Sequence, residues 1–131
     1  MKFAKYVFRV AGVYGVLVVF PLYFMEQKIG TDYPPPINHP ENYYAFIGVT
    51  VVWQILFLVI AQDPLRYRSM MLLGFLEKMS LVPAFLILFP QGRFPMPWLP
   101  LVIIDLTLGG LFLVSYFKTK IPQLNSAATS R

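Results

Sequence analysis

Four long apolar runs constrain this sequence more than any other feature. They cover approximately residues 6–25, 42–61, 69–89 and 99–117 of a chain of 131 residues. A helix that crosses a bilayer needs roughly 20 predominantly apolar residues. Charged residues make up only 13% of the chain, whereas a soluble domain averages about 25%. The sequence therefore predicts an all-α fold, a four-helix transmembrane bundle in which residues 1–117 form a single transmembrane domain and residues 118–131 a polar tail.

The distribution of Lys and Arg predicts how this bundle lies in the membrane, because cytoplasmic loops carry an excess of both residues. Eight of them precede or begin the first run, lie in the turn at 62–68, or follow the fourth run, and two lie on the opposite side. The eight are Lys2, Lys5, Arg9, Arg66, Arg68, Lys118, Lys120 and Arg131, and the two are Lys28 and Arg93. We expect an up-down-up-down bundle with both termini and the tail in the cytoplasm, in a bacterial inner membrane.

One connecting segment and the first apolar run carry their own predictions. The segment at 30–40 contains three consecutive prolines, which forbid a helix, so we expect an outward-facing loop there. The first run, in contrast, begins like a secretory signal peptide. No small-residue cleavage site follows it, and it is longer than the roughly 7–15 apolar residues of such a signal. We therefore interpret the first run as a retained helix.

Polar and ionisable side chains inside the runs are the best candidates for a functional site. A charge at the bilayer centre costs at least about 2.5–3.5 kcal/mol and normally faces a partner inside the bundle. The candidates are Arg9, Gln54, Glu77, Lys78 and Asp105. Measured from the predicted cytoplasmic ends of their helices, the depths of these groups place them in one layer. We therefore expect a polar layer or ligand-binding site that the first, third and fourth runs form and the second run supplements.

The depths and signs of the charges suggest specific pairs. Lys78 is expected to pair with Asp105, and Arg9 with Glu77. Glu77 and Lys78 are adjacent, and adjacent side chains on a helix do not face each other, so we do not expect these two to pair.

Prolines and a capping residue predict local features of the third run. Asp63 followed by Pro64 is typical of a helix start. Pro83 lacks the N–H that would bond to the carbonyl of Met79, so the sequence predicts a free carbonyl there.

Three segments in the C-terminal half carry a resemblance to known sequences. They are Asp63–Lys78 (DPLRYRSMMLLGFLEK), Gln91–Arg93 and Asp105–Thr119. This pattern resembles a family of small, uncharacterised bacterial integral membrane proteins with four spans. The resemblance implies a fold and a membrane location, and it implies no activity. The positions that it singles out are Arg66, Arg68, Glu77, Lys78 and Asp105.

Several function classes lack the residues that they need. The chain has no cysteine and one histidine, His39, so it offers no thiolate chemistry and no metal site. Its Lys and Arg flank apolar runs instead of gathering on one water-facing surface, which argues against nucleic acid as a partner. The sequence identifies no catalytic residue and leaves any cofactor unknown.

Three functions remain open for a small integral membrane protein of this kind. The first is an accessory or assembly subunit of a larger membrane complex, whose partners are membrane lipids and either other subunits or copies of itself. The second is a protein that binds or translocates a small molecule, a lipid or an ion through the Glu/Lys/Asp layer. The third is an intramembrane lipid-modifying enzyme with Glu77 or Asp105 as general acid or base. We favour the first and consider an enzyme less probable.

Overall fold

The computed structural model describes residues 2–120, and the regular secondary structure in this part of the chain is entirely helical, with no strand. Four helical segments in it are long and apolar enough to cross a membrane, namely Lys2–Phe24, Pro40–Gln62, Arg68–Leu88 and Met96–Lys118. A helix thus forms at each of the four apolar runs, which fits a small integral membrane protein. The greater part of the predicted polar tail, residues 121–131, lies outside the described residues.

The first apolar run forms a helix that changes type at its end. Helix α1 (Lys2–Val19) continues as a 3₁₀ helix, η1 (Phe20–Phe24), which has Pro21 in its first turn. A proline removes one backbone donor and clashes with the preceding turn of an α-helix, so the tighter helix begins where the proline lies.

A short helix that the sequence analysis did not predict follows η1. Helix α2 (Glu26–Asp32) covers the first residues of the segment that we expected to be a loop at 30–40, so that prediction was wrong at 30–32. The helix ends before Tyr33, because a residue that precedes a proline disfavours the helical conformation. Tyr44 fastens α2 to the next helix, since its hydroxyl donates a 2.7 Å hydrogen bond to the Glu26 carboxylate.

The second apolar run is a single helix, α3 (Pro40–Gln62). The turn after it differs from our expectation. The Asp63 side chain accepts the backbone N–H of Arg66 at 3.2 Å, so Asp63 caps a turn, and helix α4 (Arg68–Lys78) begins only at Arg68.

The third apolar run is divided into two helices. Helix α4 ends at Lys78, and helix α5 (Leu81–Leu88) begins after a turn at Met79 and Ser80. Pro83 lies in the first turn of α5, where its missing N–H does not interrupt a helix. The carbonyl of Met79 accepts the N–H of Val82 at 3.3 Å, so the prediction of a free carbonyl was wrong.

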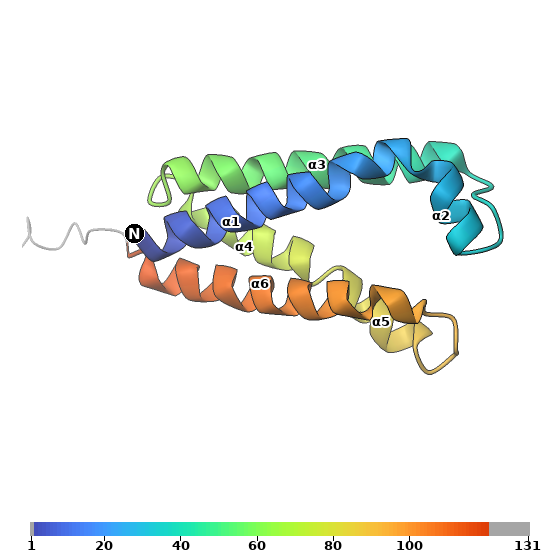
Figure 1. Ribbon diagram of the computed structural model, residues 1–131. Helices are drawn as coiled ribbons and strands as arrows, with labels where there is room; N and C mark the ends of the chain where they lie inside the picture. Colours follow the sequence, from blue (N-terminus) through green and yellow to red (C-terminus); the bar gives the residue numbers. More distant parts are fainter. Residues whose placement is uncertain (1, 121–131) are drawn as a thin grey trace, which may run out of the picture.

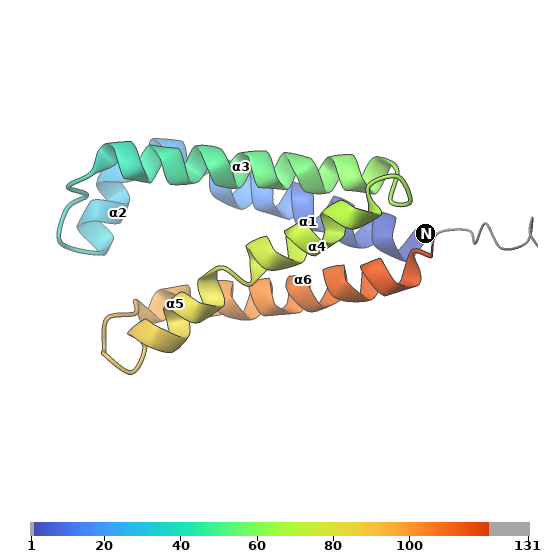
Figure 2. The ribbon, with the colours of Figure 1, turned by 180° about the vertical axis from the view of Figure 1, so that it is seen from behind.

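The helices pack as two pairs that touch strongly at one end of the molecule. Helix α1 lies along α3, while α4 and α5 lie along α6 (Leu99–Lys118), which follows the short 3₁₀ helix η2 (Met96–Trp98). The pairs meet where α1 begins and α6 ends, and they separate toward α2 and α5 (Figures 1 and 2). We call the first region the closed end and the second the open end.

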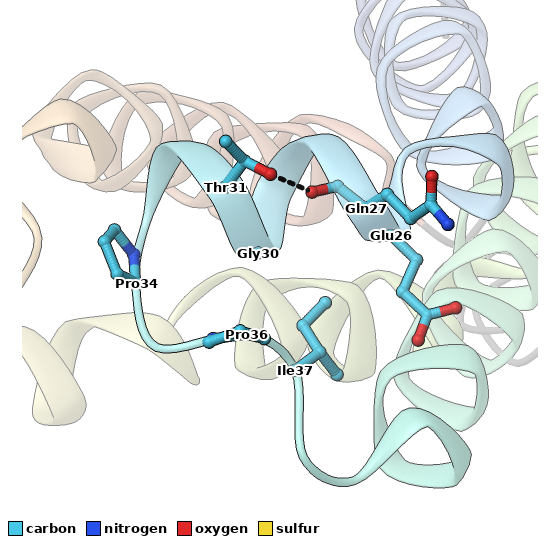
Figure 3. Close-up of a pocket in the computed structure, with 7 residues that line it drawn as sticks. All are labelled: Glu26, Gln27, Gly30, Thr31, Pro34, Pro36 and Ile37. Carbon is cyan, nitrogen blue, oxygen red and sulfur yellow. Dashed lines mark hydrogen bonds between the residues drawn. The ribbon is translucent and has the colours of Figure 1, made fainter.

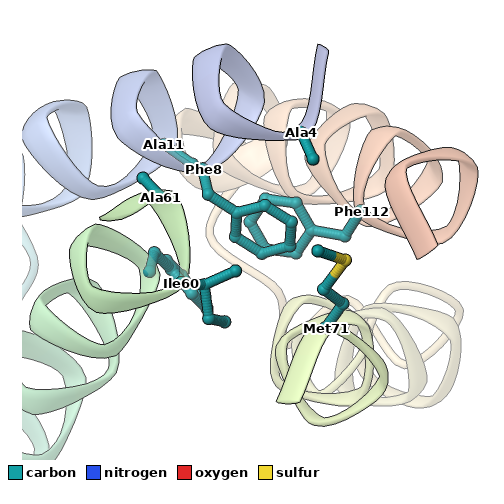
Figure 4. Packing of buried hydrophobic residues seen from close by; sticks show 8 residues of the cluster. Ala4, Phe8, Ala11, Ile60, Ala61, Met71 and Phe112 are labelled. Atoms are coloured by element: carbon teal, nitrogen blue, oxygen red, sulfur yellow. The ribbon is translucent and has the colours of Figure 1, made fainter. Parts of the chain in front are cut away.

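Three phenylalanines fill the closed end. Phe8 of α1 stacks on Phe112 of α6 with ring centroids 4.2 Å apart, and Phe57 of α3 meets Phe112 edge-on at 4.8 Å. Other apolar side chains complete this cluster, as Figure 4 shows, and they are Ala4, Ala11, Ile60, Ala61 and Met71. Helices in a membrane associate through such close packing, because lipid tails are as apolar as the side chains themselves.

Candidate ion triad at the junction of the two helix pairs

A lysine and two carboxylates come together where the helix pairs begin to separate. Lys78 is the last residue of α4, and its Nζ lies 3.5 Å from Oδ1 of Asp105 on α6 and 3.7 Å from Oε2 of Glu77. The same ammonium lies 5.3 Å from the centre of the Phe57 ring on α3. The lysine is only 6% exposed. We call Glu77, Lys78 and Asp105 the ion triad.

The ion triad contains the expected contact of Lys78 with Asp105 and also one that we did not expect. Glu77 and Lys78 are adjacent in the chain, yet both carboxylates approach the same ammonium. The lysine side chain has four flexible carbons and lies at the end of α4, so the angle between neighbouring residues on a helix does not keep its ammonium away from Glu77. The prediction that Glu77 and Lys78 do not meet was therefore wrong.

The charges of the ion triad do not balance. Two carboxylates share one ammonium, and Oε2 of Glu77 is buried without a hydrogen-bond partner in the described part of the chain. The side chains of Glu77 and Asp105 remain 18% and 26% exposed, so the site is open on one side. The arrangement can accept a proton, a cation or a hydrogen-bond donor from outside the chain.

Arg9 does not join this site. It is exposed on α1 and makes no ion pair or side-chain hydrogen bond with another residue in the range 2–120. The expected pair of Arg9 with Glu77 is thus absent from the chain. The reason is rotational, because the adjacent Phe8 is turned into the core and successive residues of an α-helix lie about 100° apart.

Gln54 also lies apart from the ion triad. It is buried between α3 and α1, where its Nε2 donates to the Thr50 carbonyl at 3.1 Å. A methyl group at Gly15 would come within 1.8 Å of the Gln54 Oε1 atom, so the missing side chain of Gly15 makes room for the amide. The predicted layer of four spans therefore reduces to a site on α4 and α6, with Phe57 of α3 beside it.

One arginine has a role in the fold that the sequence analysis missed. The Nε atom of Arg68 donates to the carbonyls of Tyr116, at 3.1 Å, and Thr119, and the guanidinium lies 3.7 Å from the centre of the Tyr116 ring. It thereby satisfies two carbonyls at the end of α6 that have no partner inside the helix. The sequence offered only a basic residue near a span, with no signal for this pairing.

Two surface hollows lie apart from the ion triad. One, of about 550 Å³, lies beside α2 and its loop (Figure 3) and is lined by Glu26, Gln27, Gly30, Thr31, Pro34, Pro36 and Ile37. The other, of about 540 Å³, lies between η1 and α3. No residue of the ion triad lines either hollow. Within residues 2–120, no group of three or more His, Cys, Asp or Glu side chains is arranged to hold a metal ion.

No protein family, curated protein or solved structure matches this chain. The resemblance to small four-span bacterial membrane proteins stays an expectation.

Proposed function

We propose that the protein is a subunit of a larger membrane assembly, held in a bacterial inner membrane by four spans in up-down-up-down order with both termini cytoplasmic. The beginning of α1 and the end of α6 lie together at the closed end (Figure 1). Lys2, Lys5 and Lys118 belong to these two helix ends, and Lys120 follows α6. The excess of positive charge at this end supports a cytoplasmic orientation for it.

The observation that carries the assembly role is the unbalanced, one-sided ion triad. An ion triad that served only to join α4 to α6 would be expected to be neutral and closed. Here a second carboxylate lies beside one ammonium and is partly exposed, in a region where an unpaired charge is costly. A neighbouring subunit that supplies a positive group or a hydrogen-bond donor would remove this cost and be held at the site.

The two other functions have less support. Transport of a small molecule or chemistry on a lipid requires a space in which the substrate reaches the carboxylates. The two hollows described above do not include the ion triad. A bundle of four helices also leaves little internal volume, so we rank binding with translocation second and lipid-modifying chemistry third.

The test is purification of the tagged full chain from its native membrane in a mild detergent. We expect it to migrate in native electrophoresis well above the 15.1 kDa of one chain and to bring other membrane proteins with it. The double variant Glu77→Gln/Asp105→Asn should lose these proteins, because it removes the charge that a partner recognises.

The matched control is Asp32→Asn, which removes an exposed carboxylate at the end of α2. This variant should retain the partners. A wild-type chain that migrates alone under conditions that preserve other membrane complexes would overturn the proposal.

A further inference from the structure

We propose that one partner at the ion triad is a second copy of this chain, which places its Arg9 beside Glu77 and Asp105. This inference rests on the proposed function, because it names a partner for the same site. It joins two features that each remain incomplete within one copy. One is the surplus carboxylate of the ion triad, and the other is Arg9 on the outside of the first span, which makes no ion pair within residues 2–120.

Arg9 lies on a face of α1 that has the character of a lipid-facing surface. Its neighbours Tyr6, Val10 and Val13 are 71%, 60% and 47% exposed and are aromatic or aliphatic. A cation on such a face is costly in hydrocarbon unless it finds an anion or extends to the membrane surface. In the described part of the chain, no carboxylate lies within ion-pair distance of Arg9.

The two incomplete features lie at similar depths. Arg9 is seven residues from the start of α1 and Glu77 nine residues from the start of α4, which corresponds to about 10 Å and about 14 Å along the helix axes. Both helices begin at the closed end (Figure 1). Two copies with the same orientation in the membrane therefore bring the arginine and the carboxylate to nearly the same level.

The chemistry of the two groups is complementary in charge and shape. The ion triad carries one surplus negative charge when its three groups are ionised, and Arg9 carries one positive charge. A guanidinium can donate two parallel hydrogen bonds to a carboxylate, and arginine suits interfacial ion pairs because it is weakly hydrated. Oε2 of Glu77 is buried beside Lys78, so the guanidinium would meet the exposed parts of the Glu77 and Asp105 side chains, which are 18% and 26% exposed.

The contact joins two different surfaces of the chain, the outer face of α1 and the open side of the ion triad. In a symmetric dimer this contact forms twice, and in a ring of several copies it forms once between each pair of neighbours. In either case every copy contributes one Arg9 and one triad, so the charges balance in a closed assembly. A second copy is thus sufficient to complete the site.

The absence of cysteine from the chain allows a direct test by crosslinking. One copy carries Tyr6→Cys, a position near Arg9, and a differently tagged copy carries Leu73→Cys, one helical turn before Glu77; both positions are exposed. The two are combined in vesicles of phosphatidylethanolamine and phosphatidylglycerol and treated with a short thiol-to-thiol crosslinker. We expect a mixed dimer that carries both tags.

Charge variants decide whether the ion pair forms this contact. Arg9→Gln in the first copy should reduce the mixed dimer at least tenfold, and Arg9→Lys should restore part of it. The matched control is Lys5→Gln, which neutralises an exposed lysine one turn earlier on the same helix and should leave the yield unchanged. Glu77→Gln/Asp105→Asn in the second copy should reproduce the loss, and circular dichroism of each variant checks its helical content.

Three outcomes would overturn the inference. A mixed dimer that is insensitive to Arg9→Gln would show that only the apolar faces associate. Dependence on phosphatidylglycerol with no effect of the Glu77 and Asp105 variants would show that Arg9 binds lipid head groups. A wild-type chain without any mixed dimer would exclude self-association at this face, while the proposed function would still stand if the native complex retained other subunits and remained sensitive to Glu77→Gln/Asp105→Asn.

Discussion

The closed end and the open end of this molecule are built from the same apolar residue types but differ in how they pack. The closed end has three phenylalanines in mutual contact and residues from all four spans in one core. At the open end, η1, α5 and η2 have no buried residue. Hydrophobicity alone therefore does not hold these helices together, because an apolar side chain is equally well accommodated by lipid.

Proline accounts for much of this difference. Ten of the twelve prolines belong to the segments of the open end. They are Pro21, Pro34, Pro35, Pro36, Pro40, Pro83, Pro90, Pro95, Pro97 and Pro100. A proline has no backbone donor and is tolerated in the first turn of a helix but not in its interior, so helix starts and turns gather at this end. The ion triad lies between the two regions.

The largest effect is expected at this boundary. Lys78→Met leaves two carboxylates without their ammonium, and the loss of one partner from a buried ion pair typically costs about 3–5 kcal/mol. The free energy of unfolding, measured by titration with a denaturing detergent in micelles, should fall by this order. The loss should grow with increasing pH, because protonation relieves the carboxylates in acid.

Two controls define the result for Lys78. Lys28→Met removes an exposed lysine from α2 at the open end and should leave stability unchanged. Adding Glu77→Gln and Asp105→Asn to Lys78→Met should recover most of the loss. If Lys78→Met were as stable as Lys28→Met, the ion triad would not be the junction between the two regions.

A smaller effect should separate the packing of the two ends. Phe112→Ala opens a cavity between Phe8 and Phe57 and should lower the free energy of unfolding by about 2 kcal/mol. This loss is smaller than is usual for soluble proteins, because moving an apolar side chain from the protein core into lipid, unlike into water, carries little cost. Phe24→Ala, at a position that is 80% exposed at the open end, should change stability by less than about 0.5 kcal/mol. Equal losses for both variants in the same detergent titration would contradict the distinction between the two ends.

The smallest effect should be confined to the open end. Tyr44→Phe removes the hydrogen bond that fastens Glu26 of α2 to α3, and it should alter global stability by less than about 0.5 kcal/mol. Amide hydrogen exchange in α2 should accelerate several-fold, while exchange in α1 and α6 stays the same. Tyr33→Phe, a change at an exposed tyrosine of the same end, serves as the control and should leave exchange in α2 unchanged.

The positions of the apolar helices could be predicted from sequence because hydropathy and length determine them directly. The runs expected at 42–61, 69–89 and 99–117 agree with the helical segments to within two residues, apart from the η2 turn that precedes α6. Helix α2 was missed because only seven residues form it, and its attachment depends on Tyr44, which is distant in sequence.

The site was predicted in part, for reasons that the individual residues make clear. The contact of Lys78 with Asp105 could be predicted from the depth of the two residues in the membrane and from the sign of their charges. The position of Arg9 depends on how α1 is rotated about its axis, which is set by the stacking of Phe8 on Phe112. The contact of Glu77 with Lys78 forms because α4 ends at Lys78. The spacing of apolar residues along the chain does not reveal where that helix ends.

Arg68 restrains the second helix pair at only one of its two ends. It clamps the first turn of α4 to the final carbonyls of α6, so these two helices cannot slide past each other at their junction. The turn at Met79 and Ser80 leaves α5 outside this restraint. Any sliding or tilting of the second pair would thus be concentrated beyond that turn, with Lys78 as the last residue that stays in place.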